Sequence, residues 1–241
     1  MKKQKLNKPR VFCIGWHKTG TTTLGEALLI LNYKVVGARL DLAEPLMKGN
    51  IDYVLQIAKE FEAFQDVPWA ALYKELDEAF PGSKFILTIR PAEAWLNSAK
   101  KHFGDRHINL HQWLYGEGNL TGNESLYLKR YQEHNEAVQD YFKGRPNDLL
   151  VMSLADGDGW QRLCSFLELD TPRKPFPHAN KGKHSYNWKD KIKDVLRKTI
   201  PLPIRRSRIA ILENMGLHWG ENRFNNHYEN RVARRKDNHK N

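Results

Sequence analysis

Residues 11–24 of the chain read Val11-Phe-Cys-Ile-Gly-Trp-His-Lys-Thr-Gly-Thr-Thr-Thr-Leu24. An apolar run comes first, a glycine-containing turn follows it, and three threonines then open a segment that favours a helix. In a turn of this kind, backbone N–H groups and the helix N-terminus point at one anion. The stretch therefore predicts a strand, a phosphate-binding loop and a helix in succession.

The lysine of this loop stands in an unusual place. A nucleoside-triphosphatase loop reads Gly-x-x-x-x-Gly-Lys-[Ser/Thr]. Gly15 and Gly20 have that spacing, but Thr21 stands where the lysine belongs, and Lys18 lies three residues earlier. We therefore expect a nucleotide phosphate other than the β- and γ-phosphates of a triphosphate.

The length of 241 residues suits one domain with a sizeable core. No apolar run approaches the roughly 20 residues that span a bilayer. The basic start of the chain lacks the apolar stretch of a signal peptide, and Cys13 and Cys164 are too few for a disulfide framework. We expect a cytoplasmic protein without a membrane span.

The formal net charge of +11 is concentrated partly at the two ends. We expect a flexible basic segment over 1–9, an α/β domain over 10–200, and a basic extension over 201–241 that packs partly on the domain. The remaining positive charge indicates anionic ligands. A nucleic acid is not the partner that we expect.

Strand and helix patterns alternate along the chain. Strands are expected over 10–15, 33–36, 62–66, 84–90 and 148–154. Helices are expected over 21–31, 50–61, 68–80, 124–143 and 159–169, and another begins at Pro91. This alternation predicts an α/β three-layer sandwich with a mostly parallel central sheet, of the P-loop nucleotide-binding type.

Three polar segments follow strand ends in this reading: the loop after the first strand, Asp66, and Arg90. Ligands of such folds bind beyond the carboxyl ends of the strands. Ser98 lies eight residues after Arg90, a little over two helical turns, so it can lie over the strand end. A guanidinium and a hydroxyl suit a phosphate.

These motifs resemble those of the sulfotransferases that use 3′-phosphoadenosine 5′-phosphosulfate (PAPS). The family loop [Lys/Arg]-x-Gly-Thr-[Ser/Thr] matches residues 18–22, and the family pair of an Arg and a Ser eight residues later matches Arg90 and Ser98. The segment 66–90 resembles a bacterial branch of the family. The resemblance covers roughly residues 10–184.

The resemblance implies a donor site and a catalytic lysine. The residues expected to bind the 5′-phosphosulfate are His17, Lys18, Thr19, Gly20, Thr21, Thr22 and Thr23. Arg90 and Ser98 are expected to bind the 3′-phosphate, and a later basic loop, Lys181-Gly182-Lys183, resembles a further contact of the family. Lys18 would stabilise charge on the bridging oxygen, and no metal is expected.

An acceptor must lose a proton as it attacks, which calls for a general base. Asp66 is the first candidate, because the family branch with a carboxylate base has it at an equivalent point. Asp66 is equally well placed to cap the helix that follows it. His102 and His107 are further candidates, and the spacing of His102, His107 and His111 fits no usual zinc site.

The sequence leaves the acceptor and several aromatic roles open. We expect a small molecule or a glycan, with an anionic one favoured by the basic charge. Trp16 and Trp95 are expected in the core more than against an adenine, and Phe103, Trp113 and Tyr115 fit either an acceptor site or the core. The alternative functions are a P-loop kinase and a non-catalytic basic protein.

Overall fold

The computed structural model describes residues 8–178 of the chain. Its centre is a five-stranded sheet in the order β2-β3-β1-β4-β5, and every neighbouring pair is parallel. The strands are β1 Val11–Cys13, β2 Val35–Val36, β3 Ala63–Gln65, β4 Lys84–Thr88 and β5 Leu149–Met152. The prediction of a parallel α/β sheet is confirmed. The predicted boundary between residues 200 and 201 lies outside the described residues.

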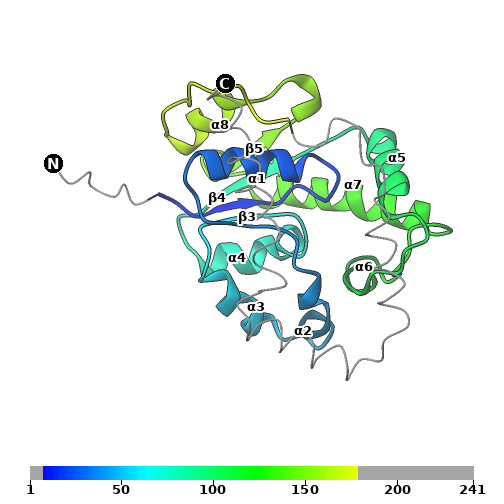
Figure 1. Cartoon of the computed structure of the whole chain (residues 1–241). Helices are drawn as coiled ribbons and strands as arrows, with labels where there is room; N and C mark the ends of the chain where they lie inside the picture. The colour runs from blue at the N-terminus through cyan, green and yellow to red at the C-terminus, as the bar shows by residue number, and fades with distance from the viewer. Residues whose placement is uncertain (1–7, 179–241) are drawn as a thin grey trace, which may run out of the picture. The chain divides into compact units, whose positions relative to one another are not determined.

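Helices cover both faces of the sheet (Figure 1). The helices expected from the sequence are α1 Thr21–Ile30, α3 Ile51–Ala58, α4 Tyr73–Ala79, α5 Ala92–Phe103, α7 Glu124–Tyr141 and α8 Trp160–Leu167. The connection from β1 leads to β2 at one edge of the sheet. The later connections lead back across the sheet, through β3 and β4, to β5 at the other edge. Right-handed crossovers then place α1 and α4 on opposite faces, which gives three layers.

Several short elements were not expected. They are the helices α2 Ala43–Met47 and α6 Asn109–Tyr115 and the 3₁₀ turns η1 Leu40–Leu42 and η3 Leu154–Asp156. The helix predicted over 68–80 begins with a 3₁₀ turn, η2 Trp69–Leu72, which α4 continues. Helices α2 and α6 lie in stretches for which the alternating pattern of the sequence predicts neither a helix nor a strand. Helix α6 packs against α2 and η1.

Aromatic side chains of adjacent strands form the centre of the core. Phe12 of β1 stacks on Phe64 of β3 with ring centroids 4.6 Å apart, and on Phe85 of β4 at 5.3 Å. All three are fully buried. The register explains the stack, because Phe12 lies directly opposite both partners. Burial of three such rings fixes the order of the three strands that lead to the site.

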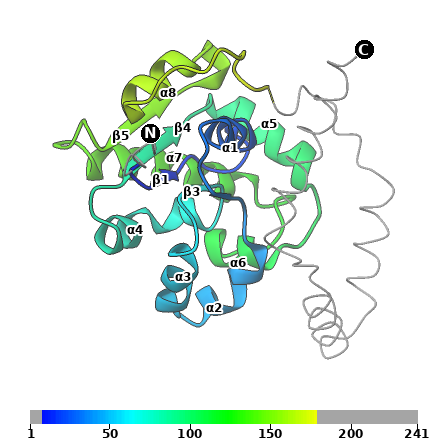
Figure 2. The ribbon, with the colours of Figure 1, turned by 60° about the vertical axis from the view of Figure 1, so that its left-hand side comes forward.

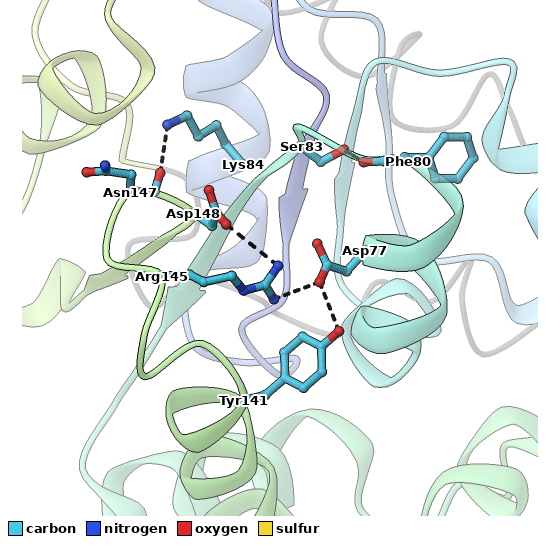
Figure 3. Close-up of polar contacts among 8 residues, drawn as sticks. All are labelled: Asp77, Phe80, Ser83, Lys84, Tyr141, Arg145, Asn147 and Asp148. Carbon is cyan, nitrogen blue, oxygen red and sulfur yellow. Dashed lines mark hydrogen bonds and ion pairs between the residues drawn. The ribbon is translucent and has the colours of Figure 1, made fainter.

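A polar cluster ties α4 to the end of α7 (Figure 3). Asp77 accepts hydrogen bonds from the Tyr141 hydroxyl at 2.9 Å and from Arg145 at 2.7 Å. Arg145 also lies over the ring of Tyr141 and 3.6 Å from Asp148, just before β5. The cluster therefore lies at the amino end of β5, opposite the carboxyl ends where the sequence places the site.

Among residues 8–178, no helix has the length and apolar character needed to cross a membrane.

Candidate functional site

The loop after β1, Asp66 after β3 and Arg90 after β4 lie together at the carboxyl edge of the sheet. Arg90 Nη1 lies 3.4 Å from the carbonyl oxygen of Lys18. The Thr21 hydroxyl donates a hydrogen bond of 2.9 Å to Asp66 Oδ2. The arrangement expected from the strand ends is thus confirmed for the loop, Asp66 and Arg90.

Two glycines of the loop are required by its shape. A Cβ at Gly15 would lie 1.9 Å from the Thr88 hydroxyl, so the loop can approach β4 only without a side chain there. Gly20 has a φ of 103°, in the left-handed region, and a Cβ there would lie 2.5 Å from Leu154. A side chain at Gly15 would displace the loop from β4, and one at Gly20 would strain the left-handed backbone and force Leu154 to move.

Side chains of α7 and of the loop itself bond carbonyl oxygens at the start of the loop. His134 of α7 bonds the Ile14 carbonyl through Nε2 at 2.7 Å. Because the carbonyl only accepts, Nε2 carries the proton, and burial lowers the pKa of His134 to about 4. The Thr19 hydroxyl donates to the Trp16 carbonyl at 2.6 Å.

The next two carbonyl oxygens are bonded in the same way. The Trp95 indole N–H donates to the His17 carbonyl at 2.8 Å, and Arg90 donates to the Lys18 carbonyl. Carbonyl oxygens repel anions, and a donor on each oxygen weakens that repulsion. The loop is therefore prepared for a negatively charged ligand before any ligand is present.

The N-terminus of α1 favours an anion as well. Its N-cap is Gly20, which has no side chain to cap the first N–H groups, and the first turn has no acidic residue. The positive end of the helix dipole thus lies at the loop. Thr22 is half-buried in this turn, and Thr23 is buried.

Lys18 is half-buried, with a φ of 66°. Burial lowers the pKa of its ammonium, and the charges of Arg90 and Arg106 lower it further, while Asp66 acts in the opposite direction. Two further cations and one carboxylate thus lie within electrostatic range of Lys18. This excess of positive charge favours anions at the loop.

Arg106 is a residue of this group that sequence reasoning missed. It follows α5 in a basic run that includes Lys101 and His102. That basic run is the feature of the sequence that could have pointed to Arg106. Its place near Lys18, however, depends on the packing of the end of α5 against the loop.

Asp66 is held by two hydrogen bonds. Oδ1 accepts from the backbone N–H of Val67 at 2.8 Å, and Oδ2 accepts from Thr21. The following turn η2 has Pro68 as its N-cap without a side-chain hydrogen bond, so Asp66 does not cap it in the expected way. Burial raises the pKa of Asp66, against the effect of both hydrogen bonds and of the Lys18 charge.

The side chain of His17 points into the interior. Its Nε2 lies 2.7 Å from the hydroxyl of Tyr115, which itself accepts a hydrogen bond from the Trp16 indole. The His17 ring stacks 5.2 Å from His111, and burial lowers its pKa strongly. Only the main chain of His17 belongs to the loop.

The other predicted residues have varied positions. Ser98 is half-buried in the middle of α5, and His102 is exposed in its last turn. Lys181, Gly182 and Lys183 lie outside the described residues.

The tryptophans expected in the core are there. Trp95 is fully buried and stacks on Tyr131 with centroids 4.4 Å apart, and Trp16 is 4% exposed. Phe103 and Tyr115 are buried, while Trp113 is half-buried. Within the described part of the chain, no group of three His, Cys, Asp or Glu side chains is arranged to hold a metal ion.

Two comparisons with known proteins bear on the chain. The pattern of a family described as a sulfotransferase domain matches residues 10–117 and 102–185. A similar protein is the Ava biosynthesis cluster protein M of Aspergillus versicolor, with 25% identity over 214 residues. That alignment covers 70% of this chain and 80% of the other protein. The first range of the family match contains the loop, Asp66, Arg90 and Arg106.

Proposed function

The chain belongs to the sulfotransferase domain family, and on that premise we propose that it transfers a sulfuryl group from PAPS to a hydroxyl or amine of an acceptor. The observation that carries this proposal is the contact between Arg90 and the loop carbonyl of Lys18. Because of it, the two segments assigned to the 5′ and 3′ ends of the donor lie close enough for one nucleotide.

The residues of the loop fit the 5′-phosphosulfate. The close approach at Gly15, the occupied carbonyl oxygens and the open N-terminus of α1 all favour a phosphate there. Arg90 and Ser98 would bind the 3′-phosphate, and Lys181, Gly182 and Lys183 remain proposed contacts of the same group.

In the proposed reaction, the acceptor oxygen or nitrogen forms a bond to sulfur while the bond between sulfur and the phosphate oxygen breaks. The electron pair of that bond stays on the phosphate oxygen, where Lys18 stabilises the new charge. The acceptor proton passes to a base. Positioning would supply most of the rate, as in phosphoryl transfer, and no metal is part of the proposal.

Asp66 is the proposed base. It lies at the same strand edge as Lys18, and burial raises its pKa toward the range in which a carboxylate accepts protons well. His102, at the last turn of α5, is the second candidate. The His102 ring packs edge-on against the Phe103 ring with centroids 4.8 Å apart, and Phe103 in turn packs against His17 of the loop at 4.7 Å.

The acceptor and the location in the cell are also proposals. An acceptor with an anionic group fits the excess of cations at the site. A cytoplasmic location agrees with the two cysteines, Cys13 and Cys164, which are buried free thiols.

A P-loop kinase is the competing function, and the position of Asp66 favours it. In such enzymes an Asp at a strand end helps to hold Mg²⁺, and Asp66 directly follows β3. The missing lysine at position 21 counts against it.

Thermal unfolding with three ligands tests these functions against one another. We would measure the unfolding of the full chain with adenosine 3′,5′-bisphosphate (PAP), with ATP and Mg²⁺, and with an oligonucleotide. At about 100 times its Kd, a ligand adds about 2.7 kcal/mol of stability. Stabilisation by PAP supports the proposal. Stabilisation by ATP and Mg²⁺ alone would favour the kinase, and by the oligonucleotide alone a basic binding protein.

A further inference from the structure

Arg106 follows the C-terminal end of α5 and is oriented by that end. Its Nε donates to the Phe103 carbonyl at 3.1 Å, and its Nη2 donates to the carbonyl of His102. These bonds turn the guanidinium back over the last turn of the helix, where it lies 5.9 Å from the Phe103 ring. The side chain is therefore directed by its surroundings and does not extend freely into solvent.

This end of α5 lies against the loop. The Phe103 ring packs edge-on against the His17 imidazole with centroids 4.7 Å apart, and His17 directly precedes Lys18. Trp95, two turns earlier in α5, donates to the His17 carbonyl. The charge of Arg106 also lowers the pKa of Lys18, so the two cations lie within electrostatic range.

The course of α5 leads from Arg90 to the segment that contains Arg106. The helix begins beside Arg90, after β4, and its other end leads to α6, which packs against α2 and η1 (Figure 2). Those two elements follow β2, and Asp66 follows its neighbour β3. Arg106 therefore lies in the connection between the end of α5 and α6.

PAPS, the donor of the proposed function, has one anionic group to which no cationic residue has yet been assigned, and that is the sulfuryl group. Arg90 and Ser98 are assigned to the 3′-phosphate, and Lys18 to the 5′-phosphate and its bridging oxygen. The sulfuryl oxygens must lie beyond Lys18, toward the acceptor and the proposed base. A guanidinium offers paired N–H groups that match the spacing of such oxygens.

We propose that Arg106 binds the sulfuryl oxygens of the donor. This inference rests on the proposed function, because it assumes that PAPS occupies the loop. It assigns to Arg106 a contact with the group that is transferred, in addition to its bonds to the end of α5. A purely structural role would instead be limited to capping the carbonyls of that helix.

PAPS and PAP separate these roles, because PAP is the same nucleotide without the sulfuryl group. We would measure the Kd of both ligands, without an acceptor, for the full-length wild type, Arg106→Gln and Arg106→Lys. We expect Arg106→Gln to weaken PAPS binding about 10- to 100-fold, the scale of a hydrogen bond to a charged group. PAP binding should change less than about threefold, and Arg106→Lys should fall between the wild type and Arg106→Gln for PAPS.

Lys101→Gln is the matched control, since it removes an exposed cation of the same helix end. It should leave both affinities within about threefold of the wild type. Equal losses of PAPS and PAP in Arg106→Gln, or no loss of either, would overturn the inference and leave the proposed donor in place. A wild type that binds neither ligand would overturn the proposed function itself, and the inference with it.

Discussion

Arg90, at the end of β4, reaches the loop that follows β1, where its Nη1 lies 3.4 Å from the carbonyl oxygen of Lys18. The two residues are 72 positions apart in the chain. The contact does two things at once: it occupies a carbonyl oxygen that would repel an anion, and it adds a cation beside the loop. A change at Arg90 should therefore alter the loop as well as any phosphate that Arg90 binds.

We expect Lys18→Ala to lower turnover about 10²- to 10³-fold, the scale for losing one donor that stabilises charge in the transition state. The affinity for PAP should fall much less, because the loop N–H groups remain. Steady-state kinetics with labelled PAPS measures the first effect and calorimetry the second. Lys59→Ala, at an exposed position after α3, is the control. Unchanged turnover in Lys18→Ala would remove this lysine from the mechanism.

Asp66→Asn should lower turnover about 10²- to 10⁴-fold, the usual contribution of a general base. The amide oxygen can still accept from the Val67 N–H and the amide NH₂ can donate to the Thr21 hydroxyl, so PAP binding should stay within about threefold. Asp52→Asn, on the exposed face of α3, serves as the matched variant and should behave as the wild type. If Asp66→Asn retains turnover while His102→Gln loses it, His102 is the base.

The plot of rate against pH should be bell-shaped. Its two limbs should lie closer together than the pKa values of an exposed aspartate and an exposed lysine. Burial raises the pKa of Asp66, so activity falls on the acid side at a higher pH than for an exposed carboxylate. Burial lowers the pKa of Lys18, so the fall on the basic side begins earlier. A profile of kcat/KM against pH measures both limbs. An acid limb that persists unchanged in Asp66→Asn would assign it to another group.

Trp95→Phe should loosen the loop while keeping most of the core. The variant retains a ring to stack on Tyr131, but the carbonyl of His17 loses its donor. A buried acceptor left without a partner costs about 1–3 kcal/mol of unfolding free energy, and PAP binding should weaken as well. Trp69→Phe is the matched control, because Trp69 is equally buried and donates to Gly37. It should lose stability without losing PAP affinity.

The protein should lose stability between about pH 6.5 and pH 4. Burial lowers the pKa of His134 to about 4, so in this interval the unfolded chain binds a proton that the folded chain excludes. The loss is on the order of 3 kcal/mol for this group. Urea unfolding at several pH values measures it. His134→Gln should show a shallower slope, whereas His107→Gln, at an exposed position, should keep the slope of the wild type.

The parts of the site that follow strand ends could be predicted from the sequence. An apolar run, a turn and a helix start are local patterns, and parallel strands bring their carboxyl ends to one edge of the sheet. The loop, Asp66 and Arg90 therefore came together as expected.

The remainder depends on contacts between distant residues. Helices α2 and α6 have five and seven residues, and helices so short are stabilised by packing more than by their own sequence. The inward direction of the His17 ring is set by Tyr115, which lies 98 positions away. The position of Arg106 depends likewise on where the end of α5 packs, which no local pattern shows.

The backbone of the loop is bonded by Trp95 of α5, by His134 of α7 and by Arg90 after β4. Its shape is thus a product of the assembled domain, and a peptide of residues 11–24 or a graft of it on another sheet would not reproduce it. A nucleotide that binds to the loop should therefore also stabilise α5 and α7 through the same hydrogen bonds. Slower hydrogen exchange in both helices, far along the chain from the ligand, is the expected signature of an occupied site.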